Sequence, residues 1–151
     1  MIGTESKLWQ LTKSTIERQG LKDTYRLTRV ESGATKAGIS DVEYVVPRWH
    51  GWVEYKVSSS RASGKVILHH AFSLSQWEWL LHHHEPAMRM RSWVLIGFTG
   101  VRSWREFMLV PAPAAGLLLH VREAPTFTKL ENTAGVEVCD TMVDVIKILG
   151  G

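Results

Sequence analysis

Cysteine is almost absent from this sequence, which has only Cys139 among its 151 residues. A single cysteine excludes an intramolecular disulfide and argues against a zinc site built from cysteines. We therefore expect Cys139 to be a small buried hydrophobic residue. Long apolar runs are also missing, because no segment approaches the roughly 18 residues that span a bilayer, and the N-terminus lacks the basic-then-apolar pattern of a signal peptide. These absences lead us to expect a cytoplasmic protein that has no membrane partner.

Runs of like charge are missing as well, although the formal net charge is +3. A mildly basic chain permits a polyanionic partner but does not require one. The sequence contains no glycine-rich phosphate loop, no Ser-His-Asp arrangement, no heptad repeat and no internal repeat. The sequence therefore gives no evidence for the classes of protein that these patterns define.

The composition that remains is that of an ordinary globular domain, with 44% hydrophobic and 22% charged residues. The length favours a single domain over residues 1–151. Hydrophobic spacing, capping residues and glycine or proline breaks predict the individual elements. They are helices at 4–19, 73–84 and 142–149 (the last capped by Asp140), and strands at 24–31, 41–46, 52–57, 92–98, 106–110 and 116–122. This order predicts an α/β or α+β domain with a central mixed sheet flanked by helices.

Three residues suited to metal chemistry lie on two neighbouring predicted strands. Asp41 begins strand 41–46, and Glu54 and Lys56 lie two residues apart on strand 52–57. Side chains alternate between the two faces of a strand, so Glu54 and Lys56 point the same way. Two carboxylates and one ammonium group can then converge on one point. This is the minimum equipment for a magnesium-assisted attack of water on a phosphodiester, because Mg²⁺ prefers oxygen ligands and lowers the pKa of its water.

The roles of the neighbouring groups follow from the same chemistry. The backbone carbonyl of Tyr55 is a candidate for an additional metal ligand, because such sites accept main-chain oxygen. Lys56 would orient the attacking water or stabilise the phosphorus in the transition state. A simpler interpretation stays open, since a Glu-x-Lys sequence is common on solvent-facing strands and needs no function.

Three short motifs together resemble the PD-(D/E)XK nuclease superfamily. They are Gly38-Ile39-Ser40-Asp41, Glu54-Tyr55-Lys56 and Ser73-Leu74-Ser75-Gln76. More closely, the chain is similar to virus-type replication-repair nuclease domains of phages and to the Holliday-junction resolvases of the same fold. The resemblance covers roughly residues 4–98 and departs from the usual pattern at Ser40, where the family usually has proline. The region after about residue 98 has no such likeness and is interpreted as an extension over about 99–151.

The resemblance implies a fold, an activity and partners. The fold would be a restriction-endonuclease-like α/β core with a central mixed sheet. The activity would be hydrolysis of DNA with Mg²⁺ or Mn²⁺, with metal bound by Asp41 and Glu54. The substrates would be branched DNA such as Holliday junctions or flaps, in phage replication or recombination. A homodimer is expected if four-way junctions are cut, since two symmetric cuts need two sites, and a phage origin would place the protein in the host cytoplasm.

Additional carboxylates and an amide are candidates for completing the site. The resemblance implies that Glu5, on the first helix, reaches the metal, although a carboxylate in a first helical turn is favoured by the helix dipole anyway. Glu17 and Glu31 are alternatives, and Glu17 is more simply a solvated surface residue. Gln76 would bind near the metal water or a phosphate, but Ser73 and Gln76 also form a capping-box pattern. We expect that the amide of Gln76 cannot fill both roles in one conformation.

Basic and aromatic residues on loops are candidates for contact with DNA, because cations around an acidic site can hold phosphates. These residues are Lys36, Arg48, Trp49, Arg61, Lys65, Arg89 and Arg91. At a turn, Trp49 would stack on a base or wedge a branch point. The histidines at 82–84 are consecutive on a predicted helix, where neighbours point about 100° apart, so we expect them near the last carbonyls and not on a metal.

Two other functions remain open at this stage. One is a DNA-binding module that keeps the nuclease fold without catalysis. The other is a sequence-specific restriction endonuclease of the same superfamily, for which this chain is short of the expected recognition insertions.

Overall fold

The computed structural model describes residues 4–30, 41–59, 64–99, 104–119 and 123–151. In these residues six strands form one sheet in the order β1-β2-β3-β4-β5-β6, in which β3 and β4 are parallel and the other neighbours antiparallel. The strands are β1 (Arg26–Arg29), β2 (Val42–Val45), β3 (His50–Ser58), β4 (Trp93–Thr99), β5 (Trp104–Pro111) and β6 (Glu137–Cys139). The predicted α/β fold with a central mixed sheet is confirmed.

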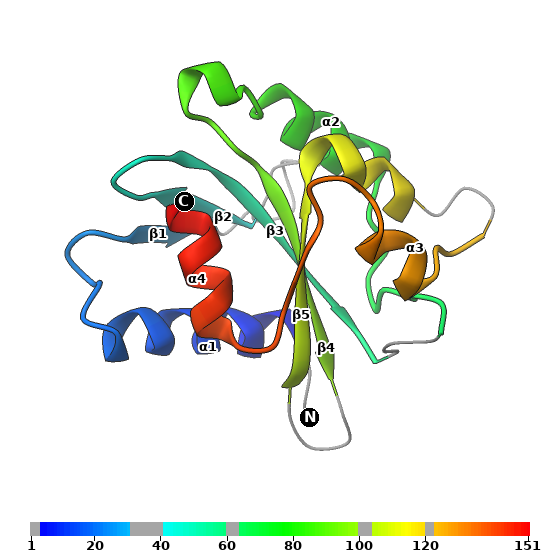
Figure 1. Cartoon of the computed structure of the whole chain (residues 1–151), viewed down its shortest axis with the longest axis horizontal. Coiled ribbons are helices and arrows are strands. Elements are labelled where there is room, and N and C mark those ends of the chain that lie inside the picture. Colours follow the sequence, from blue (N-terminus) through cyan, green and yellow to red (C-terminus); the bar gives the residue numbers. More distant parts are fainter. Residues whose placement is uncertain (1–3, 31–40, 60–63, 100–103, 120–122) are drawn as a thin grey trace.

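Helices cover both faces of this sheet (Figure 1). One face carries α1 (Glu5–Arg18) and α4 (Met142–Gly150), and the other carries α2 (Leu74–His82), the 3₁₀ helix η3 (Ala112–Leu118) and α3 (Phe127–Glu131). A short 3₁₀ turn, η2 (Pro86–Met88), follows α2. No described helix is long and apolar enough to cross a bilayer.

Successive side chains along β4 alternate between the two hydrophobic cores, one on each face of the sheet. Trp93 and Leu95 pack into the core beneath α1 and α4, whereas Val94 and Ile96 pack into the core beneath α2, η3 and α3. Strands of a parallel pair that are covered on both faces are mostly apolar, and β4 is apolar from Trp93 to Phe98. On β3, by contrast, the side chains that face the α2 layer include the charged residues Glu54 and Lys56.

Local sequence explains where the first two long helices begin. The Thr4 hydroxyl accepts a hydrogen bond from the amide of Lys7, which caps α1 as predicted. Gly20 follows the helix with a φ of 70°, a conformation that costs glycine little. Ser73 and Gln76 form a reciprocal capping box at the start of α2.

The last third of the chain corrects several predictions. The strand predicted at 116–122 is wrong, because residues 112–118 form η3, which follows the break at Pro111. The short elements α3 and β6 were not predicted, and at five and three residues they are too short to show a period. The cap of α4 is Thr141 and not Asp140, because the hydroxyl of Thr141 accepts from the amide of Asp144. Through β5, β6 and α4, described residues after 98 belong to the same sheet and core as the earlier part of the chain.

Candidate functional site

The carboxylate of Asp41 lies where the β2–β3 ladder ends. The last paired residues are Val42 and Val53, and one residue earlier the Asp41 Oδ2 accepts a hydrogen bond of 2.9 Å from the backbone N–H of Tyr55. In a strand the N–H and C=O of one residue point to the same neighbouring side. The carbonyl of Tyr55 therefore faces the edge that Asp41 occupies, as the predicted metal-binding role of this oxygen requires.

Glu54 and Lys56 form a buried pair on the α2 face of β3. Both side chains are only 3% exposed, and the Nζ of Lys56 lies 3.6 Å from the Oε2 of Glu54. The same Nζ donates a hydrogen bond of 3.0 Å to the carbonyl of Ala71, in the segment that precedes α2. The structure therefore places this Glu-x-Lys pair inside the protein, so the interpretation as a solvent-facing strand is wrong.

Burial changes the acid–base chemistry of Glu54. Its pKa is raised from the usual 4.5 to about 9, chiefly because the charged form loses its hydration and next because the Asp41 carboxylate is close. The ammonium of Lys56 opposes this rise, and Glu5 adds to it weakly. A buried carboxylate whose pKa is raised by a neighbouring carboxylate is a position where a divalent cation would relieve the repulsion.

One oxygen of the pair bears on whether the site suits a cation. The Oε1 of Glu54 is buried and has no hydrogen-bond partner, and such an orphaned acceptor calls for an explanation. A divalent cation bound by Asp41, Glu54 and the Tyr55 carbonyl would supply the missing partner. Within the described ranges, no group of three His, Cys, Asp or Glu residues could hold a metal by side chains alone, so a backbone oxygen or water would have to complete the shell.

Gln76 makes the capping contact and a contact in the site at once, so the capping box does not keep its amide away from the site, and its role near a metal water or phosphate stays a prediction. The Oε1 of Gln76 accepts from the backbone N–H of Ser73 at 3.0 Å, and this contact completes the capping box. The Nε2 of the same amide donates to the Oε2 of Glu54 at 3.1 Å. An amide carries an acceptor and two donors on separate atoms, so one conformation satisfies both contacts. The cap of α2 therefore also positions the buried carboxylate.

Glu5 lies at the other border of the site. Its Oε2 is 2.8 Å from the Nδ1 of His70, and its side chain is 23% exposed. A small pocket of about 30 Å³ lies here, and its lining includes Glu5, Trp9, Arg29, Asp41 and Tyr55. A space of this size holds one water or one ion.

The structure adds two groups that the sequence reasoning did not select, His70 and the carbonyl of Ala71. Both lie in the link that leads to Ser73, and they contact Glu5 and Lys56 respectively. His70 is one of two consecutive histidines, His69 and His70. Their position shortly before the capping box was the only available signal.

Other candidate carboxylates do not join this cluster or cannot be placed. Glu17 is exposed and lines a different pocket, as expected of a surface residue. Glu31 and the motif residues 38–40 lie outside the described residues. The same holds for two candidates for DNA contact, Lys36 and Arg61.

Three of the basic candidates for DNA contact are described and exposed. Lys65 is half exposed and pairs with Glu123 at 2.7 Å. Exposed Arg48 lies in the β2–β3 turn. Arg89, also exposed, lies beside the start of β3, where its carbonyl accepts from the amide of His50. Glu54 is four residues further along β3, or roughly 13 Å at the usual rise, so these two arginines lie away from the carboxylates.

The side chains of Trp49 and Arg91 contact each other and other parts of the protein. The guanidinium of Arg91 stacks on the ring of Trp49 at 3.8 Å and donates to the carbonyls of Ile148 and Leu149 at 3.0 and 3.4 Å. Arg91 therefore satisfies the last carbonyls of α4, a role that suits a cation at a helix C-terminus. Trp49 packs against the core beneath α1 and α4, so its ring is engaged within the protein.

The histidines at the end of α2 behave as expected. The Nδ1 of His83 lies 2.7 Å from the carbonyl of Trp79, and the two rings stack at 4.3 Å. His84 accepts a hydrogen bond from the backbone N–H of Ser92, and burial lowers its pKa. These contacts of His83 and His84 join the end of α2 to Ser92, the residue before β4.

Comparisons with known proteins give a distant likeness only. The sequence matches no protein-family model and no curated protein. Among solved structures, the chain is similar to Hjc of Archaeoglobus fulgidus, described as a Holliday junction resolvase from an archaeal hyperthermophile. The two share 13% identity, the match covers 69% of this chain and 75% of the other, and the TM-score is 0.43. Membership of the PD-(D/E)XK superfamily therefore stays a prediction that depends on the residues of the site.

Proposed function

We propose that this protein is a Mg²⁺- or Mn²⁺-dependent DNA endonuclease of the PD-(D/E)XK type. The observation that supports the proposal most directly is the buried Glu54, whose Oε1 lacks a partner beside Asp41 and Lys56. A structural core rarely retains two neighbouring carboxylates at such a cost unless they bind something.

Each residue of the cluster has a distinct role in this proposal. Asp41, Glu54 and the Tyr55 carbonyl would hold the metal, with Glu5 at its outer border. The bound metal would polarise the scissile phosphate and lower the pKa of a water. The Ala71 carbonyl holds the ammonium of Lys56 in place. This ammonium orients the nucleophile and stabilises the negative charge that develops on the phosphate oxygens. Gln76 holds the Glu54 carboxylate in place.

The proposed substrate is branched DNA, such as a four-way junction or a flap. This choice comes from the motif resemblance, and the similar archaeal structure is described as a Holliday junction resolvase. Symmetric cutting of a junction would require a homodimer. A phage origin, with the protein acting in the host cytoplasm, belongs to the same proposal.

The test is cleavage of labelled DNA by the purified protein. A four-way junction, a flap, a duplex and a single strand are each incubated with Mg²⁺, with Mn²⁺ and with a chelator. We expect cutting of a branched substrate with metal and none with the chelator. Asp41→Ala and Lys56→Ala should each lower the cutting by at least about 10²-fold, while circular dichroism and thermal melting show a folded protein. Unchanged cleavage by both variants would refute the assignment.

A second candidate is a DNA-binding module with this fold and no catalysis. The observation that favours it is the lack of three metal-ligating side chains in one group among the described residues. Binding of junction DNA in Ca²⁺, followed by no cleavage after addition of Mg²⁺ or Mn²⁺, would select this candidate.

A further inference from the structure

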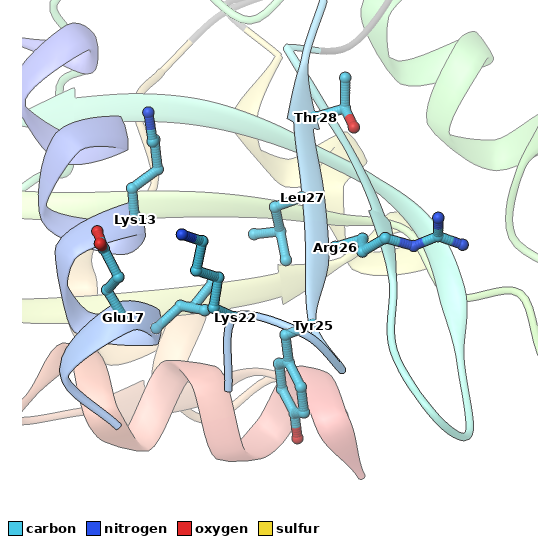
Figure 2. Close-up of a pocket in the computed structure, with 8 residues that line it drawn as sticks. Lys13, Glu17, Lys22, Tyr25, Arg26, Leu27 and Thr28 are labelled. Atoms are coloured by element: carbon cyan, nitrogen blue, oxygen red, sulfur yellow. The ribbon is translucent and has the colours of Figure 1, made fainter. Parts of the chain in front are cut away.

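A second hollow lies between α1 and the edge strand β1, apart from the carboxylates. Its volume is about 470 Å³, and its lining includes Lys13, Glu17, Lys22, Arg26 and the apolar Ile16 and Leu27. The lining thus combines three cationic residues, one anionic residue and apolar side chains. Figure 2 shows that Lys22 and Leu27 extend to the α1 side of β1, whereas the guanidinium of Arg26 points to the opposite side. Lys13 and Lys22 are therefore the cations available inside the hollow.

Residues that line the hollow and residues that line the small pocket lie along one ridge of α1. Glu5, Trp9, Lys13 and Glu17 are spaced by four residues, so they lie along one side of the helix. Glu5 and Trp9 line the small pocket beside Asp41, and Lys13 and Glu17 line the large hollow. The Nζ of Lys13 lies 5.8 Å from the centre of the Trp9 ring, so the two parts adjoin.

The edge strand follows the same course in the opposite direction. Arg29, at the end of β1, lines the small pocket, and Leu27 lines the large hollow. The two pockets are therefore successive parts of one seam between α1 and β1. From Glu5 to Lys13 this seam is roughly 12 Å long, at 1.5 Å per helical residue.

We propose that this seam, from Lys22 past Lys13 and Trp9 to Asp41, binds a single-stranded nucleic-acid segment that leads into the carboxylate site. Ammonium groups that follow a groove match the way single strands are held through their phosphates. Trp9 packs edge-on against Tyr55, with ring centres 6.2 Å apart, and forms part of the wall between these cations and the site. The stretch between Glu5 and Lys13, about 12 Å, corresponds to roughly three to four nucleotides at the stacked spacing of about 3.4 Å, and the hollow at Lys22 extends the seam further. The inference deepens the proposed function by naming the form of DNA that enters the site.

Binding without metal tests the seam separately from catalysis. Fluorescence anisotropy of a labelled twelve-nucleotide oligothymidine is measured in a chelator, between about 50 and 200 mM salt. Lys13→Gln with Lys22→Gln should weaken binding and lower the slope of log K against log salt by about 1.4, because each lost phosphate contact removes about 0.7. Glu17→Gln should strengthen binding, because it removes the one acidic side chain among those named in the hollow.

The matched control is Lys7→Gln with Lys147→Gln, which removes two exposed lysines from α1 and α4 outside the seam. We expect this variant to keep most of the wild-type slope. An equal loss in both double variants would show that only net charge matters and would overturn the proposal. So would binding of blunt duplex with no binding of the oligothymidine. If the protein cuts DNA but binds single strands equally well without Lys13 and Lys22, the seam proposal is refuted and the nuclease proposal stands. If single strands bind at the seam but no DNA is cut, only the proposed catalysis is refuted.

Discussion

Two lysine–glutamate pairs in this protein have opposite surroundings. Lys65 and Glu123 lie 2.7 Å apart with side chains 50% and 73% exposed, whereas Lys56 and Glu54 are 3.6 Å apart and 3% exposed. The exposed pair has the shorter distance, yet water screens it and such pairs contribute little. The buried pair carries the larger consequence, because its carboxylate has lost hydration and keeps an oxygen without a partner. Burial, more than distance, separates a surface contact from a candidate site.

The largest expected difference between the two pairs is in cleavage. Lys56→Ala should lower the rate of DNA cutting by about 10²–10⁴-fold, because it removes the cation beside the scissile phosphate. Lys65→Ala should leave the catalytic rate nearly unchanged and affect only the salt dependence of binding. Single-turnover cleavage of one branched substrate at saturating enzyme makes the comparison. Equal losses in both variants would erase the distinction between the pairs.

The dual role of Gln76 gives the next largest effect. Ser73→Ala and Gln76→Ala should each destabilise α2 by about 1 kcal/mol, since both break the capping box. Only Gln76→Ala also releases Glu54, and we expect a further loss of roughly 10- to 100-fold in metal affinity or activity, as for other residues that orient a ligand. Urea unfolding and cleavage rates are measured on both variants. Similar activity in the two would mean that Gln76 acts only as a cap.

The raised pKa of Glu54 predicts how stability changes with pH. Between about 4.5 and 9 the folded protein keeps a proton on Glu54 that the unfolded chain has released. Stability from this group is therefore lost as pH rises, by up to about 1.4 kcal/mol per unit. Glu54→Gln lacks this loss and should gain stability over the wild type as pH increases from 6 to 9, in urea unfolding without metal. A difference that is constant with pH would show that Glu54 titrates normally.

The smallest effect is expected at the exposed pair. Glu123→Gln removes the partner of Lys65, whose ammonium lowers the pKa of the Glu123 carboxylate. Both side chains remain hydrated when the contact is lost, so thermal melting at neutral pH should give the same melting temperature as the wild type. A clear loss of stability would mean that exposure is a poor guide to the energetics of this pair.

Much of the framework could be predicted from local sequence. The Thr4 and Ser73 caps gave the starts of α1 and α2, and the apolar run at 92–98 gave β4 to within one residue. Elements of three to seven residues in the last third, such as β6 and η3, could not be predicted, because they show no period and depend on packing against β5 and α2.

The candidate site divides in the same way. Alternation along β3 was sufficient to place Glu54 and Lys56 on one face, because a strand repeats every two residues whatever surrounds it. Only the tertiary structure decided that this face is buried, that Arg91 and Trp49 support α4 and each other, and that Ala71 and Gln76 reach Lys56 and Glu54. These outcomes depend on contacts between distant segments, and hydration is lost only when such segments pack together.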